Sequence, residues 1–181
     1  MSRRVVGIDP SLTRTGIAIV EDGLVLELWH RGSDSTGDTV RDRAERIETL
    51  AAQVTGDLFL HGVDAFVIEG PSHNSRFGKP HERAGLWWAI VSTLIRDHDA
   101  PIYEVAPQSR AKYATGKGNS KKPAVYAAVQ ETYGPVPNHD QGDALLLAAM
   151  GARVLGCPVE ATEPAEGQLA ALSALARQVA A

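Results

Sequence analysis

The pattern of apolar and polar positions along the chain predicts five strands and six helices. Short apolar runs bounded by turn residues are typical of buried strands. They lie at residues 4–9, 15–20, 24–29, 63–68 and 102–105. Apolar residues spaced by three or four positions indicate amphipathic helices. These helices are expected at about residues 39–54, 82–97, 107–114, 121–132, 140–155 and 169–179.

The order of these elements predicts the fold class. Three strands come first, and helices then alternate with the two remaining strands, which favours an α/β fold with a five-stranded mixed sheet and helices on both faces. Asp38 or Thr39 is a candidate cap for the first helix, and Ser120 for the fourth. The chain divides into a predicted domain at residues 1–157 and a tail at 158–181. The tail reads as an acidic linker and a short amphipathic helix that packs on the core, joins a partner or stays loose.

Composition excludes several classes of protein. The hydrophobic fraction is 44% and the charged fraction 22%, as in ordinary globular domains. A single cysteine, Cys157, excludes an internal disulfide and a multi-cysteine zinc site, and it fits a reducing cytoplasm. No apolar stretch approaches the roughly 20 residues that span a bilayer, and the N-terminus lacks the apolar segment of a secretion signal. We therefore expect a cytoplasmic protein without a membrane partner.

Four carboxylates stand at positions that favour chemistry. Asp9 and Glu69 each end an apolar strand, and Asp140 and Asp143 lie one turn apart at the start of an apolar helix. Buried carboxylates need a cation nearby, and converging carboxylates typically hold a hard ion such as Mg²⁺. The ordinary alternatives are a turn at Asp9-Pro10, an ion pair between Glu69 and an arginine, and helix-stabilising acids in the first turn.

Such a cluster fits two-metal-ion cleavage of a phosphodiester, in which one shared Asp on a central strand is flanked by other carboxylates. His139 precedes the acidic pair and is either a ligand, a general base or, as we favour, a solvent-facing residue. The other five histidines lack the spacing of metal ligands.

A locally basic segment accompanies the acidic cluster, although the net charge of the chain is −4. Nine basic and four acidic residues lie between positions 70 and 130, and such a face collects phosphates even on an acidic protein. A solvated or mobile surface loop is the alternative interpretation. The candidate DNA-binding residues are Lys112, Lys117, Asn119, Lys121, Lys122, Arg76, Lys79 and Phe77, the last as a base-stacking side chain.

Two adjacent tryptophans, Trp87 and Trp88, lie in the predicted helix at 82–97. They cannot both face one direction, so one of them points away from the sheet. A second copy of the chain is a suitable cover for it.

Taken together, four segments resemble the motifs of RuvC-type Holliday junction resolvases. They are Gly7–Gly16, Val67–Glu69, Tyr103–Lys121 and Asp140–Leu145, and the likeness extends over residues 4–156. The resemblance implies an RNase H-like fold, a homodimer, and cleavage of four-way DNA junctions with Mg²⁺ or Mn²⁺ held by Asp9, Glu69, Asp140 and Asp143. The lysine- and glycine-rich loop at 115–122 is more similar to compact phage members, which implies activity on a wider range of branched DNA.

Three other functions compete with this interpretation. An actin-like or sugar-kinase phosphotransferase begins with a similar motif, but it needs further phosphate loops and usually a second such domain. A nuclease of the same fold that acts on RNA differs only in its substrate. A non-catalytic junction-binding protein would gain nothing from carboxylates beside phosphates.

Overall fold

The computed structural model describes residues 2–34, 37–58, 62–71 and 79–181. In this part of the chain five strands form one sheet in the order β3-β2-β1-β4-β5. The strands are β1 (Arg4–Asp9), β2 (Thr15–Glu21), β3 (Leu24–Arg31), β4 (Ala65–Glu69) and β5 (Ile102–Val105). Strand β2 is antiparallel to both β1 and β3, whereas β4 runs parallel to β1 and β5 parallel to β4. The predicted mixed sheet is confirmed.

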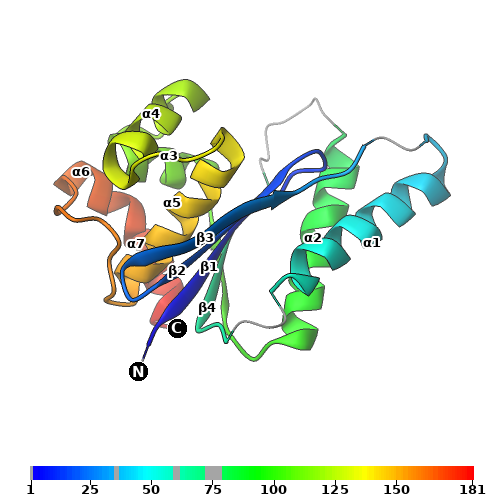
Figure 1. Ribbon diagram of the computed structural model, residues 1–181, viewed down its shortest axis with the longest axis horizontal. Coiled ribbons are helices and arrows are strands. Elements are labelled where there is room, and N and C mark those ends of the chain that lie inside the picture. Colours follow the sequence, from blue (N-terminus) through cyan, green and yellow to red (C-terminus); the bar gives the residue numbers. More distant parts are fainter. Residues whose placement is uncertain (1, 35–36, 59–61, 72–78) are drawn as a thin grey trace.

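Helices cover both faces of the sheet (Figure 1). One face carries α1 (Val40–Gly56) and α2 (Pro80–Asp97). The other carries α3 (Pro107–Thr115), α4 (Lys122–Tyr133) and α5 (His139–Val154), followed by α6 (Glu166–Leu169), a 3-10 turn (Ala170–Leu172) and α7 (Ser173–Val179). The alternation of side chains along a strand separates two cores: Val5 and Val67 face α5, whereas Val6 and Ile68 face α1 and α2.

Local signals at the helix ends agree with most of the predicted boundaries. Thr39 caps α1 and forms a reciprocal capping box with Asp42. Asn138 caps α5 by accepting from the backbone N–H of Gln141. The predicted cap at Ser120 is wrong, because α4 begins at Lys122 without a side-chain cap and the Ser120 hydroxyl contacts that of Thr115 at 2.7 Å instead.

Helix α5 is the central helix, and it is buried from Gln141 to Ala152. It lies directly on β1 and β2 because glycines at the contact leave room for its backbone. A Cβ at Gly16 would collide with the carbonyl oxygen of Asp140, and one at Gly7 with that of Ala144. These close approaches place the first turn of α5 over the end of β1.

Replacing Gly16 by alanine is therefore expected to lower the free energy of unfolding. The added methyl group must push the first turn of α5 away from β2, and overpacking of this kind costs about 1–3 kcal/mol. Chemical denaturation measures the loss. Gly167→Ala is the matched control, because a Cβ there has no neighbour within 4 Å. Equal stability of the two variants would contradict the proposed contact.

The tail at 158–181 packs on the core rather than projecting from it. Leu172 and Leu175 are buried beside α5, and the side-chain amide of Gln178 exchanges two hydrogen bonds with the backbone of Glu104 on β5, at 2.9 and 2.8 Å. Glu160 accepts from the hydroxyls of Tyr113 and Tyr133, both at 2.5 Å, and pairs with Arg153 of α5. The tail thus holds α3 and α5 together.

Across the described ranges, no helix has the length and apolar character that crossing a membrane requires.

The two adjacent tryptophans of α2 differ in their exposure to solvent. Trp87 is buried, whereas Trp88 is 61% exposed. Ile95 lies on the same face of α2 as Trp88 and is 68% exposed. The prediction that one tryptophan points away from the sheet is confirmed.

Candidate active site

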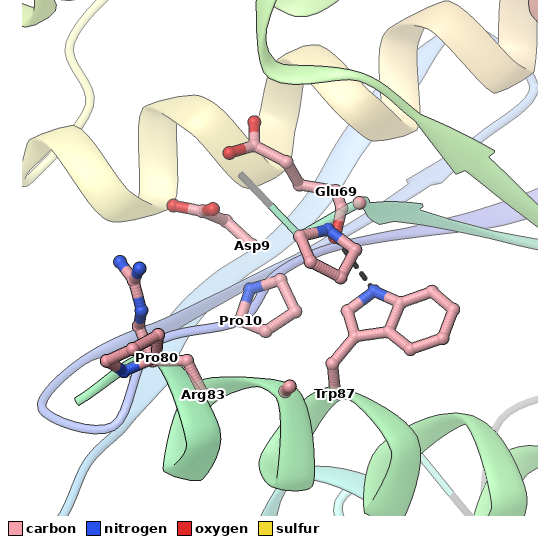
Figure 2. A pocket seen from close by; sticks show the side chains of 9 residues that line it. Asp9, Pro10, Glu69, Pro80, Arg83 and Trp87 are labelled. Atoms are coloured by element: carbon pink, nitrogen blue, oxygen red, sulfur yellow. Dashed lines mark hydrogen bonds between the residues drawn. The ribbon is translucent and has the colours of Figure 1, made fainter. Parts of the chain in front are cut away.

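The sheet itself brings Asp9 and Glu69 together. Strands β1 and β4 are adjacent and parallel, and Ile8 pairs with Ile68 immediately before the two acids. Both carboxylates therefore lie at the carboxyl edge of the sheet. Figure 2 shows them on the same side of a pocket, directed towards α5. The pocket has a volume of about 120 Å³, and Arg83 and Trp87 of α2 line it as well.

Helix α5 adds the other two acids at the same edge. Asp9 is paired in register with Gly16, and the backbone of Asp140 lies against that glycine. Asp143 follows one turn later and is only 5% exposed, comparable with 8% for Asp9. The structure thus places all four predicted acids at one end of β1, β4 and α5.

A buried arginine lies among these acids. The Nε of Arg110 on α3 is 2.5 Å from the Oε2 of Glu69, and its Nη1 pairs with the Oδ1 of Asp143. The Arg110 side chain is 9% exposed. Arg110 is one of the nine basic residues between positions 70 and 130, and no role was predicted for it. The ion pair between Glu69 and an arginine, which was the alternative interpretation of Glu69, is present with Arg110 as the partner. Arg14 lies 3.8 Å from Asp140.

The electrostatics of the cluster raise the pKa of two of its acids. Burial raises the pKa of Asp9 above its ordinary value, and Asp140 raises it further, against the lowering effects of Arg110 and Lys122. Burial and then the negative charge of Asp9 raise the pKa of Glu69 to about 7, against the same two cations. A further cation placed among these acids would favour their ionised forms.

The donor set fits a hard divalent ion, since every side chain in it offers carboxylate oxygens and Mg²⁺ and Mn²⁺ prefer oxygen ligands. Among the described residues, no three His, Cys, Asp or Glu side chains are close enough to share one ion. The guanidinium of Arg110 instead contacts both Glu69 and Asp143.

Trp87 is a second residue that sequence reasoning did not assign to the site. Its indole Nε1 donates to the backbone carbonyl of Glu69 at 2.9 Å, drawn as a dashed line in Figure 2. This bond fixes the chain at the end of β4. The only signal in the sequence was its place in an apolar helical stripe, which is equally typical of a core residue.

The predicted DNA-binding residues are found in three settings. Lys117, Asn119 and Lys121 are exposed in the segment between α3 and α4, Lys122 is exposed at the start of α4, and Lys112 is half-buried on α3. The Nζ of Lys122 lies 3.9 Å from Asp140, so this segment reaches the acids. Lys79 lies 3.9 Å from Asp38. Arg76 and Phe77 lie outside the described residues.

His139 departs from the prediction that it faces solvent. It is half-buried, its ring lies 4.2 Å from that of Tyr126, and its Nδ1 is buried without a hydrogen-bond partner in the described part of the chain. Stacking on Tyr126 places the imidazole beside α4.

Comparison with known proteins identifies the family. No protein-family model matches the chain. The crossover junction endodeoxyribonuclease RuvC of Nocardia farcinica is 31% identical over 159 residues, which cover 80% of this chain and 78% of the relative. The chain belongs to the RuvC family. The RuvC of Salinibacter ruber is 24% identical over 80% of this chain and 82% of its own length.

Solved structures of RuvC show the same fold. The Thermus thermophilus RuvC structure matches with a TM-score of 0.66 at 20% identity, over 85% of this chain and 97% of that chain. The same protein in complex with a Holliday junction substrate matches with a TM-score of 0.64 at 19% identity, over 86% of this chain and 97% of that chain. The RNase H-like fold predicted from the sequence is thereby confirmed.

Proposed function

We propose that this RuvC-family protein is a structure-selective endonuclease that cleaves Holliday junctions and other branched DNA by metal-dependent hydrolysis of phosphodiester bonds. The observation that carries the proposal is the meeting of four acids at one end of β1, β4 and α5, beside an exposed lysine-rich segment. Membership of a family whose curated relatives are named crossover junction endodeoxyribonucleases supports it.

Asp9, Glu69, Asp140 and Asp143 are the residues that would hold the metal, with Mg²⁺ as the proposed ion and Mn²⁺ as its substitute. Divalent ions at such a site activate a water and stabilise the leaving oxygen of a phosphodiester. Asp9 has the central place in this assignment, since it is buried on the middle strand between the β4 and α5 acids.

The single cysteine fits a reducing compartment such as the cytoplasm.

The DNA strand is proposed to lie along the segment that joins α3 to α4. Lys117 and Lys121 are exposed there, and Lys122 lies beside Asp140. Gly118 packs close to the backbone oxygen of Gln108, so the segment is held against α3 rather than extended. Lysines presented in this way contact phosphates without reading the sequence, which fits recognition of shape rather than of bases.

A cleavage assay with a panel of substrates tests the proposed function. Four-way junction, three-way junction, flap, linear DNA duplex and the corresponding RNA junction are incubated with the protein and Mg²⁺. Cleavage of the four-way DNA junction, with little cleavage of linear duplex, is the expected result. Preference for the RNA junction would favour the ribonuclease alternative. Tight junction binding without cleavage of any substrate would favour a non-catalytic binder.

Lys117→Ala is expected to weaken junction binding and to reduce the salt dependence of binding. One phosphate contact contributes about one unit to the slope of log K against log salt, so the slope should fall in magnitude by about one. Fluorescence anisotropy at several salt concentrations measures both quantities. Arg41→Ala is the matched control, because Arg41 is 83% exposed on α1, across the sheet from this segment. An unchanged slope would exclude Lys117 as a phosphate contact.

We also propose that the protein is a homodimer, in which the second copy covers the outer face of α2. Two large apolar side chains, Trp88 and Ile95, are exposed on this face. Beside them, a groove of about 630 Å³ runs between α1 and α2 and is lined by small residues such as Ala52 and Ala89. A dimer carries two active sites, as paired nicking of opposing strands requires.

Trp88→Glu is expected to convert the dimer into a monomer, because it buries a charge in the proposed interface. Sedimentation velocity measures the change. Val40→Glu provides the control, since Val40 is 74% exposed at the start of α1 and lies outside the proposed interface. A Trp88→Glu protein that still sediments as a dimer would place the interface elsewhere.

A further inference from the structure

Arg110 is a buried cation enclosed by the proposed metal ligands. It comes from α3, whereas its partners Glu69 and Asp143 come from β4 and α5. A guanidinium is removed from water only at a large cost, which close carboxylates must offset. Arg110 therefore neutralises part of the negative charge that four converging acids would otherwise impose on the fold.

The contacts of Arg110 are made to the oxygens that a divalent ion would need. One guanidinium nitrogen is 2.5 Å from the Oε2 of Glu69, and another pairs with the Oδ1 of Asp143. An ion bound by both acids must lie between them, where the guanidinium lies. The guanidinium and the divalent ion would both neutralise these two acids from the same position, so they cannot both be bound there.

We propose that Arg110 is a resident counter-cation that competes with divalent ions for Glu69 and Asp143 and leaves them when an ion binds. The proposal rests on the proposed function, since it takes these acids as metal ligands. The Arg110 side chain then has two positions, one in contact with Glu69 and Asp143 and one away from them.

The second position is a hollow that Arg110 also lines. It has a volume of about 190 Å³, and its lining includes Arg110, Asp143, Lys122, Gly118 and Ser120. Gly118 and Ser120 belong to the segment proposed to carry the DNA strand. A guanidinium that turns into this hollow lies beside Lys122, and it is then available to bind a phosphate with two hydrogen bonds.

This exchange couples the metal to the DNA. Releasing Arg110 from its acids costs free energy, which lowers the affinity of the protein for divalent ions in the absence of DNA. A phosphate that accepts the released guanidinium offsets that cost. By linkage, junction DNA must raise the affinity for the ion by the same factor as the ion raises the affinity for the junction.

Titration calorimetry with Mn²⁺ in the absence of DNA tests the competition. The proteins are the wild type, Arg110→Gln and Arg110→Lys, each first stripped with a chelator. Removing the competitor is expected to strengthen Mn²⁺ binding in Arg110→Gln by about tenfold or more, with an intermediate value for Arg110→Lys. The chelator-treated Arg110→Gln protein should melt at a lower temperature than the wild type, and Mn²⁺ should raise its melting temperature more.

Arg153→Gln is the matched control. Arg153 is a half-buried arginine that is also paired with a carboxylate, but its partner Glu160 belongs to the tail at 158–181. This variant should lose stability and bind Mn²⁺ with the affinity of the wild type. If Arg110→Gln binds Mn²⁺ equally or more weakly than the wild type, Arg110 supports the ligands rather than competing with the ion, and the proposal is overturned.

A measurement on the unaltered protein removes any dependence on how the variants fold. The Nε–H signal of Arg110 in a ¹⁵N–¹H spectrum, assigned by its loss in Arg110→Lys, should shift and lose its protection from exchange when Mg²⁺ is added. An unchanged signal at saturating Mg²⁺ contradicts displacement. Failure of the proposed function is a different result: a wild-type protein that neither binds Mn²⁺ nor cleaves junctions.

Discussion

Asp9→Asn and Glu69→Gln are each expected to abolish junction cleavage while leaving junction binding intact. Each substitution keeps the shape of the side chain and removes one of the negative charges that would hold the ions. Stabilisation of the transition state by a bound ion amounts to several kcal/mol, so the cleavage rate should fall by about 10³-fold or more. Single-turnover cleavage of a four-way junction, paired with a gel-shift assay, separates the two effects.

Asp38→Asn and Glu45→Gln are the matched controls, because both side chains are largely exposed and lie away from the cluster. They should cleave at the rate of the wild type. The two site variants should also be no less stable than the wild type in chelator, since each removes a buried carboxylate whose pKa is already raised. Nicking by either site variant at more than a trace of the normal rate would refute the assignment of that acid.

Divalent-ion affinity is expected to rise steeply with pH up to about pH 7 and then to level off. The pKa of Glu69 is raised to about 7 by burial and by Asp9, against the lowering effects of Arg110 and Lys122. An ion binds the ionised carboxylate, so it must displace the proton below this pH. The apparent Kd for Mn²⁺ should therefore fall by about tenfold for each pH unit between 5 and 7. Calorimetry at a series of pH values measures it.

The stability of the chelator-treated protein should have the opposite dependence on pH. The folded protein retains the Glu69 proton up to about pH 7, whereas the unfolded chain releases it near the ordinary value of 4.5. The contribution of this group is fully present below pH 4.5 and is lost as the pH rises through about 7. Mn²⁺ should suppress the loss, because it binds the folded, ionised form. A Kd for Mn²⁺ that does not vary between pH 5 and 7 would exclude Glu69 as a ligand of the ion.

The sequence was sufficient to predict the sheet and the positions of Asp9 and Glu69. Apolar runs that end in a carboxylate are local patterns, and adjacent parallel strands necessarily bring their carboxyl ends to one edge. The capping box at Thr39 and Asp42 is equally local, because it needs only residues three apart. Asp140 and Asp143 follow from the apolar helix after them, once Gly16 lets that helix approach the sheet.

The sequence did not reveal Arg110 or the place of the tail, because both depend on contacts between distant elements. Arg110 meets an acid 41 positions earlier and another 33 positions later, and α3 by itself gives no sign of which face is buried. Glu160 likewise finds Tyr113 and Tyr133 only after the chain has folded back. Ser120 has the residue type of a cap, but its hydroxyl is engaged by Thr115.

The central claim is that acids from β1, β4 and α5 surround divalent ions. A crystal soaked in Mn²⁺ and measured for anomalous scattering tests it most directly. The account predicts anomalous peaks within coordinating distance of Asp9, with Glu69 and the α5 acids as the other ligands and the guanidinium of Arg110 turned away. Peaks elsewhere on the molecule, with Arg110 still between Glu69 and Asp143, would contradict it.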